Sequence, residues 1–273
     1  MSPHNRFYFS DGLNVASYDR RAEADLSRFE DYRPFYVAAA VASGGAALEL
    51  GAGTGRVALA MAAGGVETVG LELAPGMLEL ARRKWVDVGA DIRARLSFVA
   101  GDMTDFALGR RFALIAIPFR GFQELLTVHD QKATLRCVRE HLSPDGHLVM
   151  DLRDPRLEDV LPPADDEPVA MDPLELDDGT ILSVHILKRR NNPLTQVLTE
   201  TWRFRKLDAT GQVLRSEEEV HALRWTWRFE MHHLLELCGM TVTAEYADFH
   251  GGSSTVGRDQ VWIARRANYP GTP

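Results

Sequence analysis

Leu48-Glu-Leu-Gly-Ala-Gly-Thr-Gly-Arg56 is the stretch of sequence that decides the fold of this chain. It begins in a short apolar run, which we predict as a strand over 46–50, and it opens a segment of helical period over 55–63. Glycine at such a strand-to-helix turn lets the backbone approach a ligand at the start of the helix. The stretch therefore predicts a ligand site above the first strand of an α/β domain.

Short apolar runs alternate with helical segments from Ala47 to Asp151, which is the pattern of repeated βαβ units on a parallel sheet. The further elements predicted there are strands at 66–71, 96–100, 112–117 and 147–152, helices at 75–88 and about 130–141, and a turn at Leu142-Ser-Pro-Asp-Gly146. A helix at 229–237 and strands at 241–246 and 260–264 resume the pattern near the C-terminus. We predict an α/β fold that is Rossmann-like and doubly wound, with a mostly parallel seven-stranded sheet.

Two segments lie outside this pattern. Residues Tyr18 to Ala42 are mostly helical by composition and are predicted to form a lid. After the core, runs rich in β-branched and aromatic residues predict an inserted antiparallel β flap, with strands at 181–190, 196–206 and 212–223. The predicted regions are a helical lid with the ligand-binding α/β core at 1–154, the β insertion at 155–224, and the completion of the core at 225–273.

Composition excludes several classes of function. The formal net charge of −8 disfavours nucleic-acid and anionic-membrane partners, because a polyanion is not attracted to an acidic surface. Cys137 and Cys238 form no C-x-x-C pair, so we expect no metal site. No apolar run approaches the ~20 residues that span a bilayer, and we expect a cytoplasmic protein.

Each of the first three predicted strands has a carboxylate within it or close after its end. Glu72 ends the second strand, where a carboxylate can accept the hydroxyl hydrogens of a ribose. Asp102 follows the third strand, where its carboxylate can accept a hydrogen bond from the exocyclic amine of an adenine. Glu49 precedes the glycine loop and would repel a pyrophosphate, whereas it suits a cationic sulfonium ligand. The third glycine, Gly55, also stands one place earlier than in the dinucleotide pattern G-x-G-x-x-G.

The glycine stretch resembles motif I of the class I S-adenosylmethionine-dependent methyltransferases. Gly70-Leu-Glu-Leu-Ala-Pro-Gly-Met-Leu78 is similar to the ribose-binding second motif of that family, and Leu142–Leu148 resembles its turn into the fifth strand. The resemblance implies S-adenosyl-L-methionine as the cofactor. It also implies an early aromatic residue at the methionine end, for which Tyr18 and Tyr36 both remain candidates. The full set of predicted cofactor-binding residues is Tyr18, Tyr36, Glu49, Gly51, Ala52, Gly53, Thr54, Gly55, Glu72, Leu73, Met77, Gly101, Asp102, Met103 and Pro118.

The acceptor is expected beyond the carboxyl ends of the parallel strands. The predicted substrate-binding residues are Phe119, Arg120, Phe122, Gln123, Arg153, Trp227 and His250. Arg120 and Arg153 are expected either to bind an anionic acceptor group or to pair with Asp151, Asp154 or Glu124. No catalytic residue is assigned, and the candidates for a general base, if one is used, are His250, His221 and His129.

The flap and two further segments, 106–112 and 117–120, resemble bacterial small-molecule enzymes that include the macrolide sugar N,N-dimethyltransferases. This likeness implies methyl transfer to a small-molecule acceptor by in-line displacement, with an amine favoured over a hydroxyl. Two alternatives remain: an NAD-dependent oxidoreductase, although no tyrosine is followed by a lysine four places later, and a non-catalytic S-adenosylmethionine-binding partner subunit. A homodimer formed through the exposed edge of the flap is also expected.

Overall fold

The computed structural model describes residues 6–26, 32–155, 168–253 and 259–267. Its main sheet consists of β1 (Ala47–Leu50), β2 (Thr68–Glu72), β3 (Leu96–Ala100), β4 (Phe112–Ile117), β5 (Leu142–Arg153), β11 (Met240–Tyr246) and β12 (Asp259–Arg266). The strand order is β11-β12-β5-β4-β1-β2-β3. Strands β1 to β5 run parallel, and β12 runs antiparallel to β5 and β11, its two neighbours. The predicted Rossmann-like, mostly parallel seven-stranded sheet is confirmed.

Helices cover both faces of this sheet, as the alternation along β1 requires. Ala47 packs against α3 (Arg33–Ser43) and α4 (Arg56–Ala63), whereas Leu48 and Leu50 belong to the cluster that holds α7 (Val128–His141) and α9 (Arg228–Leu237). The helix α5 (Pro75–Asp87) packs on the same side as α4, since Trp85 of α5 belongs to the same apolar cluster as Ala58 of α4. Two short helices, α6 (Ala90–Arg93) and η1 (Gly121–Glu124), fill the connections after α5 and β4.

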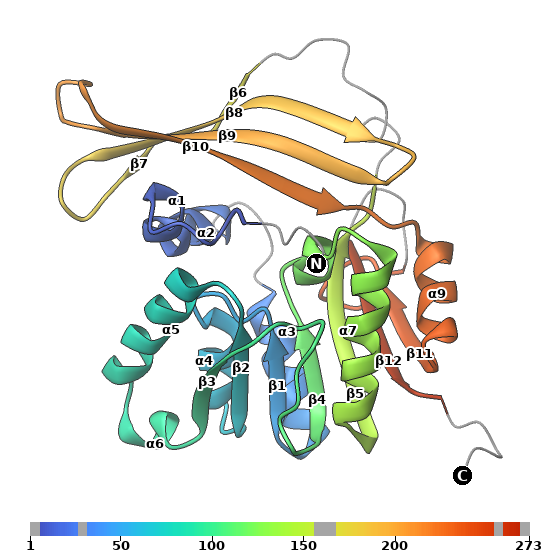
Figure 1. The fold of residues 1–273 in the computed structure, drawn as a ribbon. Helices are drawn as coiled ribbons and strands as arrows, with labels where there is room; N and C mark the ends of the chain where they lie inside the picture. The colour runs from blue at the N-terminus through green and yellow to red at the C-terminus, as the bar shows by residue number, and fades with distance from the viewer. Residues whose placement is uncertain (1–5, 27–31, 156–167, 254–258, 268–273) are drawn as a thin grey trace.

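The predicted antiparallel flap is also present. Its strands are β6 (Val169–Ala170), β7 (Leu174–Glu175), β8 (Ile181–Asn192), β9 (Val197–Leu207) and β10 (Val213–Arg224), in the order β10-β9-β8-β6 with β7 paired to β8. Figure 1 shows the flap arching over α1 (Leu13–Ala16) and α2 (Tyr18–Leu26), which lie between it and the core. Val184 and Phe204 of the flap pack with Phe7 and Leu13, so the N-terminal segment joins the two layers.

Several predicted boundaries differ from the structure. The predicted turn at 142–146 lies inside β5, where the pairing passes from Phe112↔Leu142 to Leu114↔His147 and leaves the intervening residues as an irregularity. A Cβ at Gly146 would lie 2.8 Å from the Phe112 carbonyl oxygen, which explains the glycine. The predicted helical segment 18–42 is described as α2 and α3. The loop 249–258 is also predicted on the acceptor side, and its residues 254–258 lie outside the described residues.

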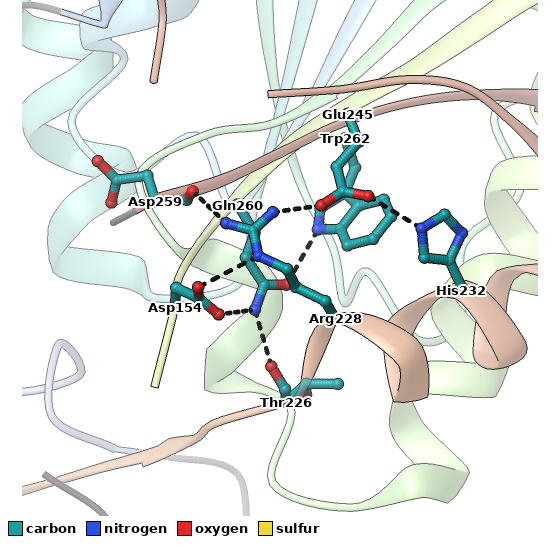
Figure 2. A network of polar contacts seen from close by, with 8 residues as sticks. All are labelled: Asp154, Thr226, Arg228, His232, Glu245, Asp259, Gln260 and Trp262. Atoms are coloured by element: carbon teal, nitrogen blue, oxygen red, sulfur yellow. Dashed lines mark hydrogen bonds and ion pairs between the residues drawn. The ribbon is translucent and has the colours of Figure 1, made fainter. Parts of the chain in front are cut away.

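One buried polar network fastens both ends of the flap to the sheet (Figure 2). Asp154 follows β5 and Thr226 follows β10, and Gln260 Nε2 of β12 donates to Asp154 Oδ1 at 2.5 Å and to the Thr226 carbonyl at 3.0 Å. Arg228 adds ion pairs to Asp154 and Glu245. Because the entry and the exit of the insertion share these partners, the orientation of the flap is fixed at its base. No helix in the described ranges has the length and apolar character needed to cross a membrane.

Candidate active site

A cavity opens at the carboxyl ends of β1 to β4. The strand β1 lies between β2 and β4, so the chain moves outward from it in both directions, and open α/β sheets bind ligands at this switch point. The predicted residues that line the cavity are Tyr18, Gly51, Gly53, Glu72, Leu73, Met77, Gly101, Asp102, Met103, Pro118 and Phe119. The structure therefore brings together most of the predicted cofactor residues and one predicted acceptor residue.

The glycines of the loop have two different roles, one at the cavity and one in helix packing. Gly51 and Gly53 have φ values of 68° and 55°, a region that favours glycine, and both face the cavity. Gly55 has a φ of 79° but serves packing, because a Cβ there would lie 2.5 Å from Phe98 Cζ of β3. The neighbouring Ala52 and Thr54 are buried and do not line the cavity.

Glu72 ties the glycine loop to the second strand. Its Oε2 accepts a hydrogen bond from Gly53 N at 2.6 Å, and its Oε1 accepts one from Ala74 N at 2.7 Å. Burial raises the pKa of Glu72, and the hydrogen bonds from the backbone oppose this rise. A carboxylate has about four lone-pair sites and Glu72 lines the cavity, so the side chain can still accept a hydrogen bond from a ribose hydroxyl.

Asp102 and two methionines line the adjoining part of the cavity. Asp102 Oδ1 accepts hydrogen bonds from Thr104 N and Thr104 Oγ1, both at 2.8 Å, which fixes the carboxylate after β3. Met77 of α5 is buried, and Met103 packs against the main core. Their polarizable side chains and the carboxylate match the flat face and the amino edge of an adenine.

Glu49 and Arg56 carry buried polar atoms without partners among the described residues. Glu49 Oε2 and both terminal nitrogens of Arg56 make no hydrogen bond, although they are shielded from solvent. Burial raises the pKa of Glu49, and the Arg56 charge opposes this rise. The Arg56 guanidinium lies 5.9 Å from the centre of the Tyr32 ring. A buried carboxyl group and a buried guanidinium with unsatisfied atoms suit the amino and carboxylate groups of an amino-acid ligand. Neither residue lines the cavity, and sequence reasoning missed Arg56, whose signal was its place at the first position of α4.

The two candidate aromatic residues have different surroundings. Tyr18 lines the cavity, and burial raises its pKa to about 12, so its hydroxyl stays protonated at neutral pH. Tyr36 is fully buried away from the cavity, and its hydroxyl donates to Asp151 Oδ1 at 2.6 Å. Asp151 also accepts from Phe119 N at 2.7 Å and from Arg120 N at 3.0 Å. Tyr36 therefore supports the turn after β4 rather than facing the cavity.

Most of the predicted acceptor residues do not line the cavity. Phe122 is fully buried in the core, and Gln123 hydrogen-bonds the backbone of Arg224 and Arg153. Arg120 lies 3.8 Å from Asp259, a partner that the sequence did not suggest. The remaining three predicted acceptor residues outside the lining set are Arg153, Trp227 and His250.

The three histidines proposed as a general base differ in burial and in their position relative to the cavity. His129 and His250 are exposed and lie outside the cavity lining. His221 is buried on the inner side of the flap, and its Nε2 lies 2.9 Å from Glu124 Oε1. His221 thus contacts a residue that lines the cavity.

Sequence reasoning missed the N-terminal wall of the cavity. Tyr8 and Phe9 line it, and the Tyr8 ring meets the Tyr18 ring edge-on with centroids 5.6 Å apart. Glu124 and Asp130 are further lining residues that were not predicted. Residues 6–12 carry no periodic pattern, and their place follows from the flap above them, so the sequence offers no local signal.

The N-terminal helices are held on both sides. Asp19 of α2 accepts from Thr54 Oγ1 at 2.5 Å through Oδ1 and pairs with Lys84 Nζ at 2.8 Å through Oδ2, which binds the helix to the core. On the flap side, Glu217 accepts from Leu13 N at 2.6 Å and Glu219 accepts from Asn14 Nδ2 at 2.8 Å. The N-terminal helices are thus bound both to the core, at the glycine loop and α5, and to β10 of the flap.

Comparison with known proteins shows that this chain is similar to methyltransferases. Residues 47–146 match the family described as "Methyltransferase domain". The chain is 34% identical over 85 residues to a dTDP-3-amino-3,4,6-trideoxy-alpha-D-glucopyranose N,N-dimethyltransferase of Streptomyces venezuelae, with 31% of this chain and 32% of that protein covered. It is 36% identical over 106 residues to a dTDP-3-amino-3,6-dideoxy-alpha-D-glucopyranose N,N-dimethyltransferase of Streptomyces fradiae, with 38% of each covered. The matches thus span about a third of the length of these curated relatives.

The likeness of fold extends over the whole chain. The solved structure of the CcbJ methyltransferase from Streptomyces caelestis superposes with a TM-score of 0.75, at 23% identity, and covers 97% of this chain and 99% of that one. Residues 47–146 thus match a methyltransferase domain, and the chain has the fold of the class I S-adenosylmethionine-dependent methyltransferases and resembles the sugar N,N-dimethyltransferases among them.

Proposed function

We propose that this protein transfers a methyl group from S-adenosylmethionine to an amine nitrogen of a small molecule. The observation that carries the proposal is the cavity at the switch point of the sheet, where Glu72 is bound to the glycine loop and Asp102 is held by Thr104. The two curated relatives are N,N-dimethyltransferases of amino sugars by name, which supports nitrogen as the methylated atom.

Each part of the cofactor has residues suited to it. Glu72 would receive the ribose hydroxyls, and Asp102 with Met77 and Met103 would hold the adenine. Glu49 and Arg56 are the candidates for the methionine end, because its ammonium and carboxylate groups would satisfy buried atoms that lack partners, although neither side chain lines the cavity.

The chain itself has a limited chemical task. The cofactor supplies a methyl group already activated by the sulfonium, so the protein needs chiefly to align the acceptor in line and to exclude water. Tyr8, Phe9, Phe119 and Leu125 give the cavity an apolar wall beside the carboxylates. Tyr18 of α2 also lines the cavity, and the flap lies above the N-terminal helices (Figure 1).

The charge of the cavity favours an amine acceptor, whose neutral nitrogen becomes cationic as it takes up the methyl group. Glu72, Asp102, Glu124 and Asp130 line it, and the described lining residues include no lysine or arginine. Carboxylates in a partly desolvated site attract both a sulfonium and an ammonium group. An amine acceptor fits this field better than a neutral hydroxyl.

The proposal is tested with methyl-labelled S-adenosylmethionine and a panel of nucleotide-linked amino sugars, each matched with its hydroxyl counterpart. Label is expected on the amine members alone. Transfer to the hydroxyl members alone would contradict the choice of nitrogen.

We also propose that two copies associate through the flap. The strand β10 is a full-length edge of the second sheet, and Leu214 and Val220 on it are more than half exposed. An unpaired edge with apolar side chains is a ready surface for a second strand. A cytoplasmic location and the absence of a nucleic-acid partner stay predictions from the sequence.

A further inference from the structure

Glu124 lines the cavity and is not among the residues proposed above to bind the cofactor. It is the last residue of η1, directly after the turn that follows β4, and it lines the cavity together with Tyr8 and Phe119. Its charge contributes to raising the pKa of Glu72 and of Tyr8. The Glu124 carboxylate therefore acts electrostatically inside the same cavity as the ribose-binding candidate.

The flap delivers one side chain to this carboxylate. On β10, Glu217, Glu219 and His221 alternate with outward residues and point to the inner side, where the first two bind the N-terminal segment. His221 Nε2 lies 2.9 Å from Glu124 Oε1. A carboxylate can only accept at that distance, so Nε2 carries the hydrogen and donates it.

The imidazole has little freedom to turn. The Phe7 ring stacks on it with centroids 4.3 Å apart and planes 19° from parallel, and the Trp202 ring meets it edge-on at 6.3 Å. His221 is also only 8% exposed. These contacts fix the direction from which Nε2 meets the carboxylate, and thereby fix the orientation of Glu124.

We propose that Glu124 binds the amine group of the acceptor through an N–H while the nitrogen lone pair faces the methyl group, and that His221 is a positioning residue that orients the Glu124 carboxylate toward the amine. This inference rests on the proposed methyl transfer to nitrogen. An amine N–H can donate to the carboxylate, which offers about four lone-pair sites. A hydroxyl acceptor gains less from an ionised carboxylate, so the pair selects amines over alcohols. The flap thus contributes to specificity from outside the methyltransferase domain.

The probe for this site is sinefungin, an analogue of S-adenosylmethionine in which a carbon bearing an amine replaces the methylated sulfur. Its cation lies near the position of the transferred methyl group, whereas S-adenosylhomocysteine carries no charge there. Calorimetry on the full chain gives the dissociation constants of both compounds. Their ratio reports the ammonium subsite, and the constant for S-adenosylhomocysteine alone reports the nucleoside site.

The wild type is expected to bind sinefungin about tenfold more tightly than S-adenosylhomocysteine, and Glu124→Gln is expected to bring the two within about twofold, since a charged hydrogen bond is worth about 1.5–3 kcal/mol. His221→Ala is expected to reduce the ratio about threefold. His221→Gln should keep the ratio, because its amide can still donate to Oε1. His233→Ala, an exposed histidine of α9, is the matched control.

The outcomes separate the two claims. An unchanged ratio in Glu124→Gln, with S-adenosylhomocysteine still bound, would overturn the ammonium site and leave the proposed function intact. An equal loss of affinity for both compounds in His221→Ala would show a merely structural role for His221 and overturn its positioning role. Failure of the wild type to bind S-adenosylhomocysteine would reject the proposed function itself.

Discussion

Asp151 Oδ1 accepts a hydrogen bond from Phe119 N at 2.7 Å, and this bond joins the carboxyl end of β5 to the turn after β4. Phe119 and Arg120 have φ values of 51° and 64°, a conformation that costs non-glycine residues roughly 1–3 kcal/mol each. Asp151 and Tyr36 hold this turn in place beside the cavity. A buried carboxylate that the sequence assigned only to possible ion pairs therefore shapes the acceptor side of the site.

The ionisation of Asp151 makes stability depend on pH. Burial raises its pKa from 3.8 to about 6, against the hydrogen bond from Tyr36 and the charge of Arg120. The native state therefore holds this proton more tightly than the unfolded state, and the associated stability is present at low pH and lost as pH rises through about 6. From about pH 4 to about pH 7, the wild type should lose up to about 3 kcal/mol of unfolding free energy relative to Asp151→Asn.

Urea unfolding at several pH values measures this difference. Asp105→Asn, an exposed carboxylate near β3, is the control and should follow the wild type. A difference between the wild type and Asp151→Asn that stays constant with pH would contradict the raised pKa.

Glu72→Gln should weaken binding of S-adenosylhomocysteine about tenfold, since it removes charge-assisted acceptors for the ribose and keeps the size of the side chain. Calorimetry measures the dissociation constant, and circular dichroism checks the fold. Glu79→Gln is the matched control, because Glu79 is exposed on α5 and pairs only with Arg83 in the described contacts. Equal affinities of Glu72→Gln and the wild type would remove Glu72 from the ribose site.

Asp19→Asn should speed the dissociation of S-adenosylhomocysteine roughly fivefold, because it weakens the bonds that hold α2 to Thr54 and Lys84. Stopped-flow displacement gives this rate. Asp91→Asn removes a comparable carboxylate from the surface pair with Arg95 and should leave the rate unchanged. The same rate in Asp19→Asn as in the wild type would show that α2 does not retain the ligand.

Val220→Lys should convert a dimer into a monomer, because it places a charge in the middle of the exposed edge strand β10. Light scattering on the purified protein measures the mass in solution. Leu237→Lys, on the exposed side of α9, is the control and should stay dimeric. A wild-type mass equal to that of one chain would reject the proposed dimer.

The local pattern of the sequence was sufficient for the sheet and for the ligand-facing strand ends. Residues 96–100 and 112–117 form strands with the predicted bounds, because continuous apolar runs bounded by turns leave little alternative. Glu72 and Asp102 were found since the carboxyl ends of parallel strands meet at one edge.

The missed residues depend on contacts between distant segments. Tyr8 reaches the cavity because the flap, about 200 residues later, packs on Phe7 and Leu13. Glu124 and His221 are 97 residues apart, and no local pattern relates them. Glu49 was expected at the ligand, but it is buried beside Arg56 outside the cavity lining, so its contact with a cofactor stays a prediction.

Calorimetric titration of the wild-type chain with S-adenosylhomocysteine and, in parallel, with NAD tests the central claim most directly. The geometry of Glu72, Asp102 and the glycine loop predicts a dissociation constant on the order of micromolar for the first compound and no binding heat for the second. Binding of NAD without binding of S-adenosylhomocysteine would contradict the account.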